Sequence, residues 1–370
     1  MTTIIVGGGA AGLASAIRLK QNNKNANVII LERLQSIGKK ILATGNGRCN
    51  ITNKNAKHYA EVLNFFNSLG LVLREDEGGR IYPYSQKAET VLEILLNECN
   101  NLKIKIITEC NVDDIKKSKN TFTLSTTKGI FKAENVIIAT GGMAQKNLGS
   151  NGSGYTLVKK FGHSITPLSP ALVQLTSSSK YPRAIKGTRT KCNIKIELDG
   201  QVKKEEYGEV LFTDYGLSGI ATMNLSDIVG KNFALKEPKK CIAILDLIPE
   251  MRKEDLINYL NKFGSLTGIL GTKLANIISK QADGNPEKCA EFAKNWRLII
   301  TGTKGYDFAQ ITSGGVPLNE VDDFESKKAD NLYICGEILD LQYECGGFNL
   351  DSAWYCGIKA ADKICNKMKK

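Results

Sequence analysis

The stretch Thr3-Ile4-Ile5-Val6-Gly7-Gly8-Gly9-Ala10-Ala11-Gly12 decides the fold of this chain. Its first four residues are apolar or β-branched and predict a short strand, and Leu13–Lys20 predicts a helix. Between them lies the pattern G-x-G-x-x-G, which is formed by Gly7, Gly9 and Gly12. A glycine pattern at a strand–helix turn is typical of dinucleotide-binding domains.

The three glycines have different roles in such a turn. Gly7 permits the tight turn, Gly9 lets the backbone approach a pyrophosphate, and Gly12 allows the helix to pack closely on the strand. The free N–H groups at the helix start favour the anion. The alternative is a glycine turn in some other βαβ unit.

An acidic residue supports the dinucleotide interpretation. The next apolar strand, Asn27–Leu31, ends at Glu32, about 20 residues after Gly12, where this fold places an acid on the ribose hydroxyls of adenosine. Glu32 disfavours a 2′-phosphate at this position, whereas the neighbouring Arg33 would tolerate one. We therefore expect a Rossmann-type nucleotide site.

Length and composition indicate a globular α/β protein. The chain has 370 residues, 42% of them apolar, and 35 glycines, so we expect two or three domains. The net charge is +12, but the lysines are scattered in pairs such as Lys116-Lys117 and Lys159-Lys160 without a basic block. This favours a solvated lysine-rich surface and argues against a nucleic-acid partner.

Other classes of protein are disfavoured by what the sequence lacks. It has no charged leader and no run of about 18 apolar residues, so we expect a soluble cytoplasmic protein without membrane contact. The ten cysteines form no Cys-x-x-Cys, and there are two histidines. We therefore expect no metal site, no vicinal redox dithiol and no disulfide framework.

The region after the first two strands favours FAD over NAD. The expected strand Ile104–Thr108 is followed by a polar β-meander through Val112, Thr121–Thr126 and Ile130–Ala133. An uninterrupted α/β domain would be typical of a nicotinamide dehydrogenase. The meander leads into the strand Asn135–Ala139, which closes in Ala-Thr-Gly-Gly, as in flavin members of the dinucleotide-binding class.

The C-terminal region contains a second glycine–acid turn. The strand Leu332–Cys335 runs into Gly336-Glu337, and Gly346-Gly347 precedes a final helix that we expect to end near Met368. Glu337 would bind the ribityl hydroxyls, and the positive end of the helix would face the pyrimidine edge of a flavin. The alternative is a plain helix-start turn.

Several segments together resemble the BaiN-type, aminoacetone-oxidase-like FAD-dependent oxidoreductases. They are LERLQSIGKKILATGNGRCNITN, GGRIYPYSQKA, ATGG, GSGYTLVKKFGHSITPLSPALVQL, FTDYGLSG, ITSGGVPLNEVD and GEILDLQYECGGFNLDSAW. The resemblance implies that a tightly bound FAD contacts Gly7, Gly9, Ala10, Ala11, Gly12, Glu32, Arg33, Lys40, Gly47, Arg48, Cys49, Asn50, Val112, Thr140, Gly141, Gly142, Gly336, Glu337, Asp340, Gly347, Phe348 and Asn349. Two positions depart from the family: Asp214 replaces the usual His, and Cys345 precedes the Gly-Gly.

The middle of the chain has no second strand–GxGxxG–helix unit to hold NAD(P)H. Instead we expect a small β-barrel or sandwich and a helical subdomain. The expected strands are Lys191–Leu198, Gln201–Tyr207, Glu209–Thr213 and Cys241–Leu247, and the expected helices are Lys253–Lys262, Lys273–Gln281 and Pro286–Trp296. The expected domains are a discontinuous FAD-binding domain (1–185 and 309–370), an inserted β domain (186–249 and 297–308) and a helical subdomain (250–296).

Tyr215 and Arg48 are the candidate catalytic residues. A tyrosine at the flavin face can donate a proton after hydride addition, and Arg48 can meet a phosphate or an anionic substrate. Arg80, Tyr82 and Tyr84 are further candidates for substrate contact. Each of the tyrosines, Tyr215 included, could equally be a packed aromatic side chain.

His163 and Cys49 are expected to be structural. We expect His163 to satisfy a loop carbonyl. We expect Cys49 to be a small residue packed beside the ring, and a catalytic thiol with a partner such as Cys345 is the alternative.

The sequence thus predicts an FAD-dependent oxidoreductase that passes a hydride through flavin N5. Two directions fit: NAD(P)H, as a transient donor, reduces a small unsaturated or carbonyl compound, or an amine-type substrate is oxidised by oxygen. An RNA-binding flavoprotein that acts on a tRNA-like partner and a non-catalytic flavin-holding protein are the alternatives. The sequence leaves the oligomeric state open.

Overall fold

The computed structural model describes residues 1–368, and the chain divides into two compact units. The first unit combines Met1–Leu168 with the chain from Ile311 onward, and the second is Ser169–Gln310. Both chain ends therefore contribute to the first unit, as the sequence predicts. The first boundary falls after Leu168, whereas the sequence places it after 185.

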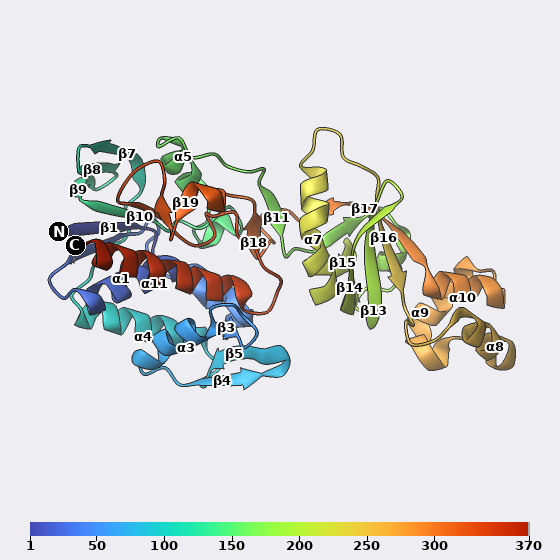
Figure 1. Ribbon diagram of the computed structural model, residues 1–370. Coiled ribbons are helices and arrows are strands. Elements are labelled where there is room, and N and C mark those ends of the chain that lie inside the picture. Colours follow the sequence, from blue (N-terminus) through green and yellow to red (C-terminus); the bar gives the residue numbers. More distant parts are fainter. Residues whose placement is uncertain (369–370) are drawn as a thin grey trace. The chain divides into compact units, whose positions relative to one another are not determined.

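A seven-stranded, mostly parallel sheet forms the centre of the first unit (Figure 1). Its order is β19-β20-β21-β10-β1-β2-β6. The strands are β1 (Thr2–Val6), β2 (Asn27–Leu31), β6 (Lys105–Ile107), β10 (Asn135–Ile138), β19 (Val321–Asp322), β20 (Glu325–Ser326) and β21 (Leu332–Ile334). Because β10 pairs in parallel with both β1 and β21, the C-terminal strand completes the sheet that the N-terminal strand begins.

Two helices from opposite ends of the chain lie side by side in this unit, α1 (Ala10–Asn22) and α11 (Phe348–Met368) (Figure 1). They approach closely because position 357 is glycine: a Cβ atom there would lie 2.2 Å from the carbonyl oxygen of Ala11. The other helices of this unit are α2 (Lys39–Ala43), α3 (Tyr59–Ser68), α4 (Ala88–Asn101) and α5 (Ser153–Lys159).

Two small antiparallel sheets complete the first unit. The expected meander is confirmed as β7 (Val112–Ser118), β8 (Thr121–Thr126) and β9 (Gly129–Ala133). The second small sheet contains β3 (Thr52–Asn53), β4 (Leu73–Asp76) and β5 (Arg80–Pro83). Short 3₁₀ turns lie at Thr44–Gly47, Glu77–Gly79, Lys146–Leu148 and Leu318–Glu320, and a short strand, β18, at Ile311–Ser313.

The second unit contains a closed barrel of six strands, in the order β12-β15-β14-β13-β16-β17. These strands are β12 (Leu175–Ser177), β13 (Arg189–Leu198), β14 (Gln201–Phe212), β15 (Gly216–Ser218), β16 (Cys241–Asp246) and β17 (Trp296–Thr303); the short β11 (Ser169–Ala171) precedes them. Of the two expected forms, barrel or sandwich, the barrel is confirmed. Residues 169–185 belong to this unit because β12 is one of its barrel strands.

The second unit departs from the sequence expectations in three places. The two strands expected at 201–207 and 209–213 are one strand, because Gly208 continues the pairing of β14 with β13 opposite Cys192. Trp296 begins β17 instead of ending a helix. A helix that the sequence analysis missed, α7, occupies Ile220–Phe233.

The remaining helices of the second unit share one apolar core with the barrel. They are α6 (Lys180–Ala184), α8 (Lys253–Phe263), α9 (Thr267–Gln281) and α10 (Pro286–Lys294). Leu256 of α8, Ile278 of α9 and Ala290 of α10 are buried in the same cluster as Ile194 and Leu298 of the barrel.

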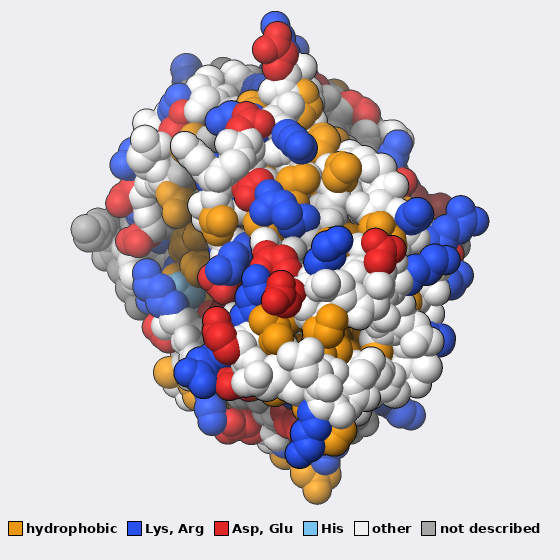
Figure 2. Space-filling view, turned by 90° about the vertical axis from the view of Figure 1, so that its right-hand side faces the viewer, with side chains coloured by type: hydrophobic (Ala, Val, Ile, Leu, Met, Phe, Trp, Pro, Cys, Tyr) orange, Lys and Arg blue, Asp and Glu red, His pale blue; other side chains and the backbone are white. Residues whose placement is uncertain are grey.

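The surface carries both signs of charge. Figure 2 shows one face of the molecule, where Lys and Arg side chains are interspersed with Asp and Glu side chains. Among the described residues, no helix combines the length and apolar character needed to cross a membrane.

Candidate functional site

The glycine turn between β1 and α1 has the space that a bound group requires. A Cβ atom at Gly12 would lie 2.0 Å from the carbonyl oxygen of Gly7, so Gly12 is required by the protein itself. Gly7 has φ +104, and a Cβ atom there would lie 2.5 Å from the carbonyl oxygen of Ala139. A Cβ atom at Gly9, in contrast, would meet no protein atom within 4 Å. The absence of a side chain at Gly9 therefore leaves room for something other than protein.

Glu32 is fixed at the end of β2 by two backbone donors. Its Oε2 accepts a hydrogen bond from the N–H of Gly8 at 2.9 Å, and its Oε1 accepts one from the N–H of Leu34 at 2.8 Å. The carboxylate is thus held directly beside the glycine turn. Arg33 donates from Nη2 to the carbonyl oxygen of Gly149 at 3.2 Å.

Lys40 and Glu337 bring distant segments of the first unit together. Lys40 Nζ lies 2.6 Å from Glu337 Oε2, and Glu337 Oε1 accepts a hydrogen bond from the N–H of Thr312 at 2.9 Å. A Cβ atom at Gly142 would lie 2.4 Å from Thr312 Oγ1. The segments that contain Lys40, Gly142, Thr312 and Glu337 therefore meet around one ion pair.

Arg48 is held by three side chains. Its guanidinium donates to Tyr82 Oη at 3.2 Å, to Gln86 Oε1 at 3.2 Å and to Asp76 Oδ2 at 3.3 Å. Its Cζ also lies 4.3 Å from the centre of the Tyr82 ring. These contacts fix the 44–50 loop, so we assign Arg48 a positioning role beside its predicted catalytic one.

Cys49 is a neutral thiol packed into the core of the first unit. It is fully buried, and its backbone has φ 59. Burial raises the pKa of this thiol to about 12, against a smaller opposing effect of its hydrogen bond with Thr44. All ten cysteines of the chain are free thiols in the structure. This geometry favours the packed role over the catalytic one.

The start of α11 contacts the 50–53 segment. Gly347 has φ +103, and a Cβ atom there would lie 2.6 Å from the carbonyl oxygen of Thr52 and 2.9 Å from Asn50 Oδ1. The Asn349 side chain accepts from the N–H of Tyr343 at 3.0 Å and donates to its carbonyl oxygen at 2.9 Å. Both hydrogen bonds join the Asn349 side chain to the backbone of Tyr343, so they close the loop before α11.

Several buried polar atoms at these segments have no partner among the described residues. They are Asn50 Oδ1, Thr140 Oγ1 and Ser313 Oγ. Burying such an atom without a hydrogen bond is costly, so native structures usually provide a partner. Together with the space at Gly9, these atoms fit a long polar group such as FAD.

The structure places most of the remaining predicted cofactor residues along the same segments of the first unit. Gly141 (φ 71) and Gly336 (φ 80) lie just after β10 and β21, and Val112 begins β7. Asp340 is already engaged: Thr166 Oγ1 donates to Oδ2 at 2.8 Å and Gln342 Nε2 to Oδ1 at 2.6 Å. Ala10, Ala11, Gly47 and Phe348 lie at the starts of α1 and α11 or in the 44–47 turn.

Sequence reasoning missed the roles of Thr312 and Thr166. Thr312 holds Glu337 through its N–H, and its Oγ1 accepts from the N–H of Met143 at 2.7 Å. Thr166 Oγ1 accepts from the N–H of Gly315 at 2.9 Å. The signal was the polar run Thr312-Ser313-Gly314-Gly315, to which no role was assigned.

Tyr215 belongs to the barrel unit, where a lysine covers its ring. Lys304 Nζ lies 4.4 Å from the centre of the Tyr215 ring and 4.1 Å from that of Phe308. Asp214, which replaces the usual histidine, pairs with Lys186 at 2.7 Å. That ion pair is exposed and contributes little stability.

His163 is structural, but its partners differ from the expected loop carbonyl. Its Nδ1 lies 2.7 Å from Glu320 Oε2 and its Nε2 lies 2.7 Å from Ser326 Oγ. Of the other predicted substrate contacts, Tyr82 is buried and Tyr84 is exposed.

The comparisons with known proteins decide the family. The model of the HI0933-like protein Rossmann domain matches residues 1–363. The chain belongs to the HI0933-like family. This confirms the resemblance and the Rossmann fold that the sequence predicts, and with them the predicted class, an FAD-dependent oxidoreductase.

Two curated relatives match nearly the whole chain of this HI0933-like protein. It is 39% identical to the 3-dehydro-bile acid delta(4,6)-reductase of Clostridium scindens, over 96% of this chain and 97% of the relative. It is 29% identical to the ribosomal RNA dihydrouridine synthase of Haemophilus influenzae, over 95% of each chain.

Solved structures support the fold of the HI0933-like protein. The 3-ketosteroid delta1-dehydrogenase of Sterolibacterium denitrificans has a TM-score of 0.54 at 12% identity, with 99% of this chain and 100% of that chain covered. A flavocytochrome c3 fumarate reductase has a TM-score of 0.53 at 16% identity, with 99% and 78% covered. At these identities the likeness shows the fold alone.

Proposed function

We propose that this chain reduces a carbon–carbon double bond conjugated to a carbonyl group in a small molecule, with FAD as cofactor and NAD(P)H as electron donor. The observation that carries the proposal is the 39% identity to a 3-dehydro-bile acid delta(4,6)-reductase over nearly the full length of both chains. That name describes reduction of double bonds in a 3-oxo compound. When bound, FAD supplies hydride transfer at its N5 atom.

Separate segments of the first unit fit the successive parts of FAD. The space at Gly9 accommodates the pyrophosphate, and Glu32 binds the adenosine ribose. Glu337, held by Lys40 and Thr312, binds the ribityl hydroxyls. The N-terminus of α11 would hold the pyrimidine edge of the flavin, where its partial positive charge would favour electron uptake.

Tyr215 is the proposed proton donor in this reaction. Hydride addition to a conjugated double bond leaves negative charge on the substrate, and a proton must follow. A phenol can provide it. Arg48 positions the 44–50 loop through Tyr82 and Gln86, and it is the candidate contact for an anionic substrate group.

A second candidate is reduction of a uridine in RNA. It is favoured by the ribosomal RNA dihydrouridine synthases of Haemophilus influenzae and Escherichia coli, which are 29% and 25% identical over 95% of this chain. The double bond that distinguishes uridine from dihydrouridine is also conjugated to a carbonyl. The two candidates therefore share one chemistry and differ in what carries the reacting ring.

Anaerobic stopped-flow spectroscopy tests the proposal. We expect NADH or NADPH to bleach the flavin, and a 3-oxo-4,6-diene steroid to restore its absorbance faster than an isolated ketone does. A uridine-containing RNA oligonucleotide is the second acceptor. Restoration by the RNA alone favours the second candidate, and restoration by oxygen alone contradicts both.

A further inference from the structure

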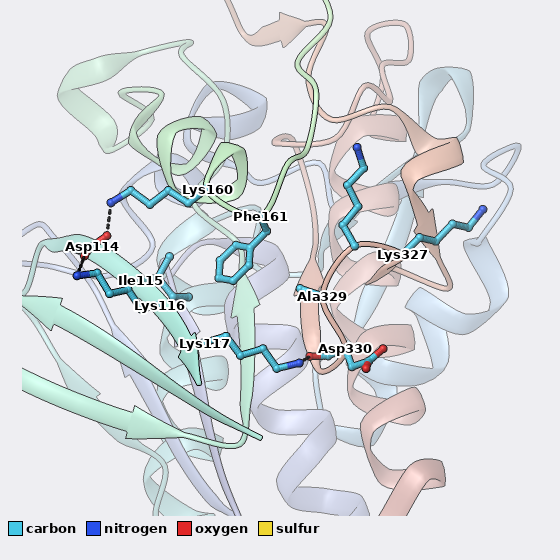
Figure 3. Close-up of a pocket in the computed structure, with 10 residues that line it drawn as sticks. Asp114, Ile115, Lys116, Lys117, Lys160, Phe161, Lys327, Ala329 and Asp330 are labelled. Carbon is cyan, nitrogen blue, oxygen red and sulfur yellow. Dashed lines mark hydrogen bonds and ion pairs between the residues drawn. The ribbon is translucent and has the colours of Figure 1, made fainter. Parts of the chain in front are cut away.

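Five lysines from three separate segments line one pocket in the first unit. The pocket has a volume of about 750 Å³. Figure 3 shows ten of the residues that line it. Lys116 and Lys117 come from β7, Lys160 follows α5, and Lys327 and Lys328 precede β21. Asp114 and Asp330 are the acidic side chains in the lining. Lysine pairs that look scattered in the sequence therefore converge in space.

Three of these five ammonium groups form ion pairs, and those of Lys117 and Lys327 contact carbonyl oxygens instead. Lys117 Nζ donates to the carbonyl oxygen of Asp330 at 2.7 Å, and Lys327 Nζ donates to that of Asn319 at 2.9 Å. Carbonyl oxygens orient an ammonium without neutralising it, and each ammonium has three donors. Lys116 and Lys160 share the single carboxylate of Asp114. The pocket thus retains positive charge and free N–H donors.

A buried network fixes the wall that carries Lys327 and Lys328. Ser326 Oγ accepts hydrogen bonds from the N–H groups of Lys328 and Ala329, both at 3.0 Å, and contacts His163 Nε2. Lys328 Nζ also donates to the carbonyl oxygen of Gly162 at 2.6 Å and lies 3.2 Å from Glu320 Oε1. The wall is therefore pre-organised, which lowers the entropic cost of binding.

The same network does not form a hydrolytic triad. Its order, Ser326, His163 and Glu320, is that of a serine nucleophile, a base and an acid. Ser326 is buried, however, with 4% of its surface exposed, and its oxygen already accepts two backbone donors. The network supports the basic pocket instead.

The pocket lies beside the N-terminal ends of β21 and β10, whereas the cofactor turns follow the C-terminal ends of these strands. Asp330, in its lining, precedes β21, and the carbonyl oxygen of Asn331 accepts from the N–H of Val136 at the start of β10. The turns at Gly141 and Gly336 follow the ends of the same strands. A strand of four residues spans roughly 13 Å. A small ligand in the pocket would not reach both sites, whereas a polymer would.

We propose that this pocket binds the phosphodiester backbone of an RNA strand. The inference rests on the second candidate function, since an RNA substrate needs an anchor beyond its reacting base. Lysines are suited to phosphate groups as point charges. Ile115, Phe161 and Ala329 complete the lining, and the Phe161 ring lies between the β7 lysines and the 327–330 loop (Figure 3).

Salt-dependent RNA binding tests this proposal. The probe is a fluorescein-labelled single-stranded 20-mer of uridine, measured with the FAD-loaded protein by fluorescence anisotropy from 50 to 300 mM KCl. The pocket variant is Lys116→Gln with Lys327→Gln. The matched control is Lys24→Gln with Lys105→Gln, which removes equal charge on the β2–β6 side of the sheet.

We expect the pocket variant to raise Kd about tenfold at 100 mM salt and to reduce the slope of log K against log salt by about 1.4. In the control variant, the changes in Kd and in the slope should each be less than half as large. Equal losses in both variants, or no RNA binding by the parent protein, would overturn the proposal. So would an unchanged slope of log K against log salt in the pocket variant.

The flavin reaction provides an independent readout. Reoxidation by a small conjugated ketone is measured in the same variants and should be unchanged, because neither Lys116 nor Lys327 is among the predicted cofactor contacts. If the parent protein reduces the ketone but binds no RNA, the pocket proposal fails while the first proposed function stands.

Discussion

Lys40 Nζ and Glu337 Oε2 lie 2.6 Å apart although 297 positions separate the two residues in the chain. Their side chains are 23% and 19% exposed, so water screens the pair only partly. The contact joins α2, which follows β2 in the chain, to the turn after β21. Both halves of the discontinuous unit are thereby held at one point of the predicted FAD site.

Lys40→Met should therefore weaken FAD binding. The change leaves the Glu337 carboxylate partly buried with the N–H of Thr312 as its remaining hydrogen-bond donor. We expect at least a tenfold rise in the Kd for FAD, which corresponds to about 1.4 kcal/mol. The measurement is flavin fluorescence after titration of the apoprotein. Lys39→Met is the matched control, and an equal loss in both variants would exclude a specific role for the ion pair.

A pair of glycine variants separates cofactor binding from folding. Gly9→Val adds a Cβ atom that no protein atom approaches within 4 Å, so the protein should fold but lose FAD. Gly12→Val puts a Cβ atom 2.0 Å from the carbonyl oxygen of Gly7 and should prevent folding. Circular dichroism and the flavin absorbance check both outcomes. Full FAD occupancy in folded Gly9→Val would contradict the proposed site.

Cys49→Ser should leave FAD bound and turnover within about tenfold of the parent, a barrier change near 1.4 kcal/mol. Since burial raises the pKa of this thiol to about 12, there is almost no thiolate at neutral pH to act as a nucleophile. Iodoacetamide should accordingly fail to modify Cys49 in the folded protein. Loss of turnover with FAD in place, or a Cys49–Cys345 disulfide formed during the cycle, would favour the catalytic thiol.

The sequence predicts the parts of this molecule that depend on local spacing. The strand–turn–helix at Gly7–Gly12, the strand before Glu32 and the meander all follow from short patterns, and the structure confirms them. Helix α7 was missed because its residues, Ile220–Phe233, include β-branched and small polar side chains with little helical periodicity. In the structure it packs against β14 and β11, which lie apart from it in the sequence.

Long-range contacts were beyond sequence reasoning for a different reason. Thr312 and Glu337 both lie near turn motifs, but only the fold brings the N–H of one to the carboxylate of the other. The convergence of Lys117 and Lys328 in one pocket likewise has no signature in the chain order. Spacing patterns predict which residues share a face of one helix or strand. The residues of these pairs lie on different segments and meet only in the folded chain.

Stability should fall on acidification because of His163 and Glu320. Burial lowers the pKa of His163, so below about pH 6.5 the unfolded chain takes up a proton that the folded histidine resists. Burial alone would raise the pKa of Glu320, but hydrogen bonds from Ser164, His163 and Lys328 outweigh it and lower the pKa to about 2. Its stabilisation is present above pH 4.5 and is lost as the pH falls toward 2.

The variant His163→Gln tests the first of these two steps. It should lower stability at pH 7.5 by about 1–3 kcal/mol, because Glu320 and Ser326 lose a buried partner. It should also flatten the decline in Tm between pH 7 and 5, since it removes one of the two histidines whose pKa burial lowers. Thermal melts over that range provide the measurement, with His58→Gln as the control for the other histidine. An unchanged pH profile would show that His163 does not control acid stability.

Tyr215→Phe tests the proposed proton donor in the reaction itself. The substitution keeps the ring that Lys304 Nζ covers at 4.4 Å, so the barrel unit should fold as before. Loss of a general acid typically slows proton transfer by about 10²–10⁴. We therefore expect flavin reoxidation by a conjugated ketone to slow at least 100-fold, while flavin reduction by NAD(P)H stays within about twofold of the parent. Tyr207→Phe, which removes an exposed hydroxyl that donates to Glu250 elsewhere in the same unit, is the control. If Tyr215→Phe leaves both half-reactions unchanged, Tyr215 is a packed aromatic residue and the proton comes from another group.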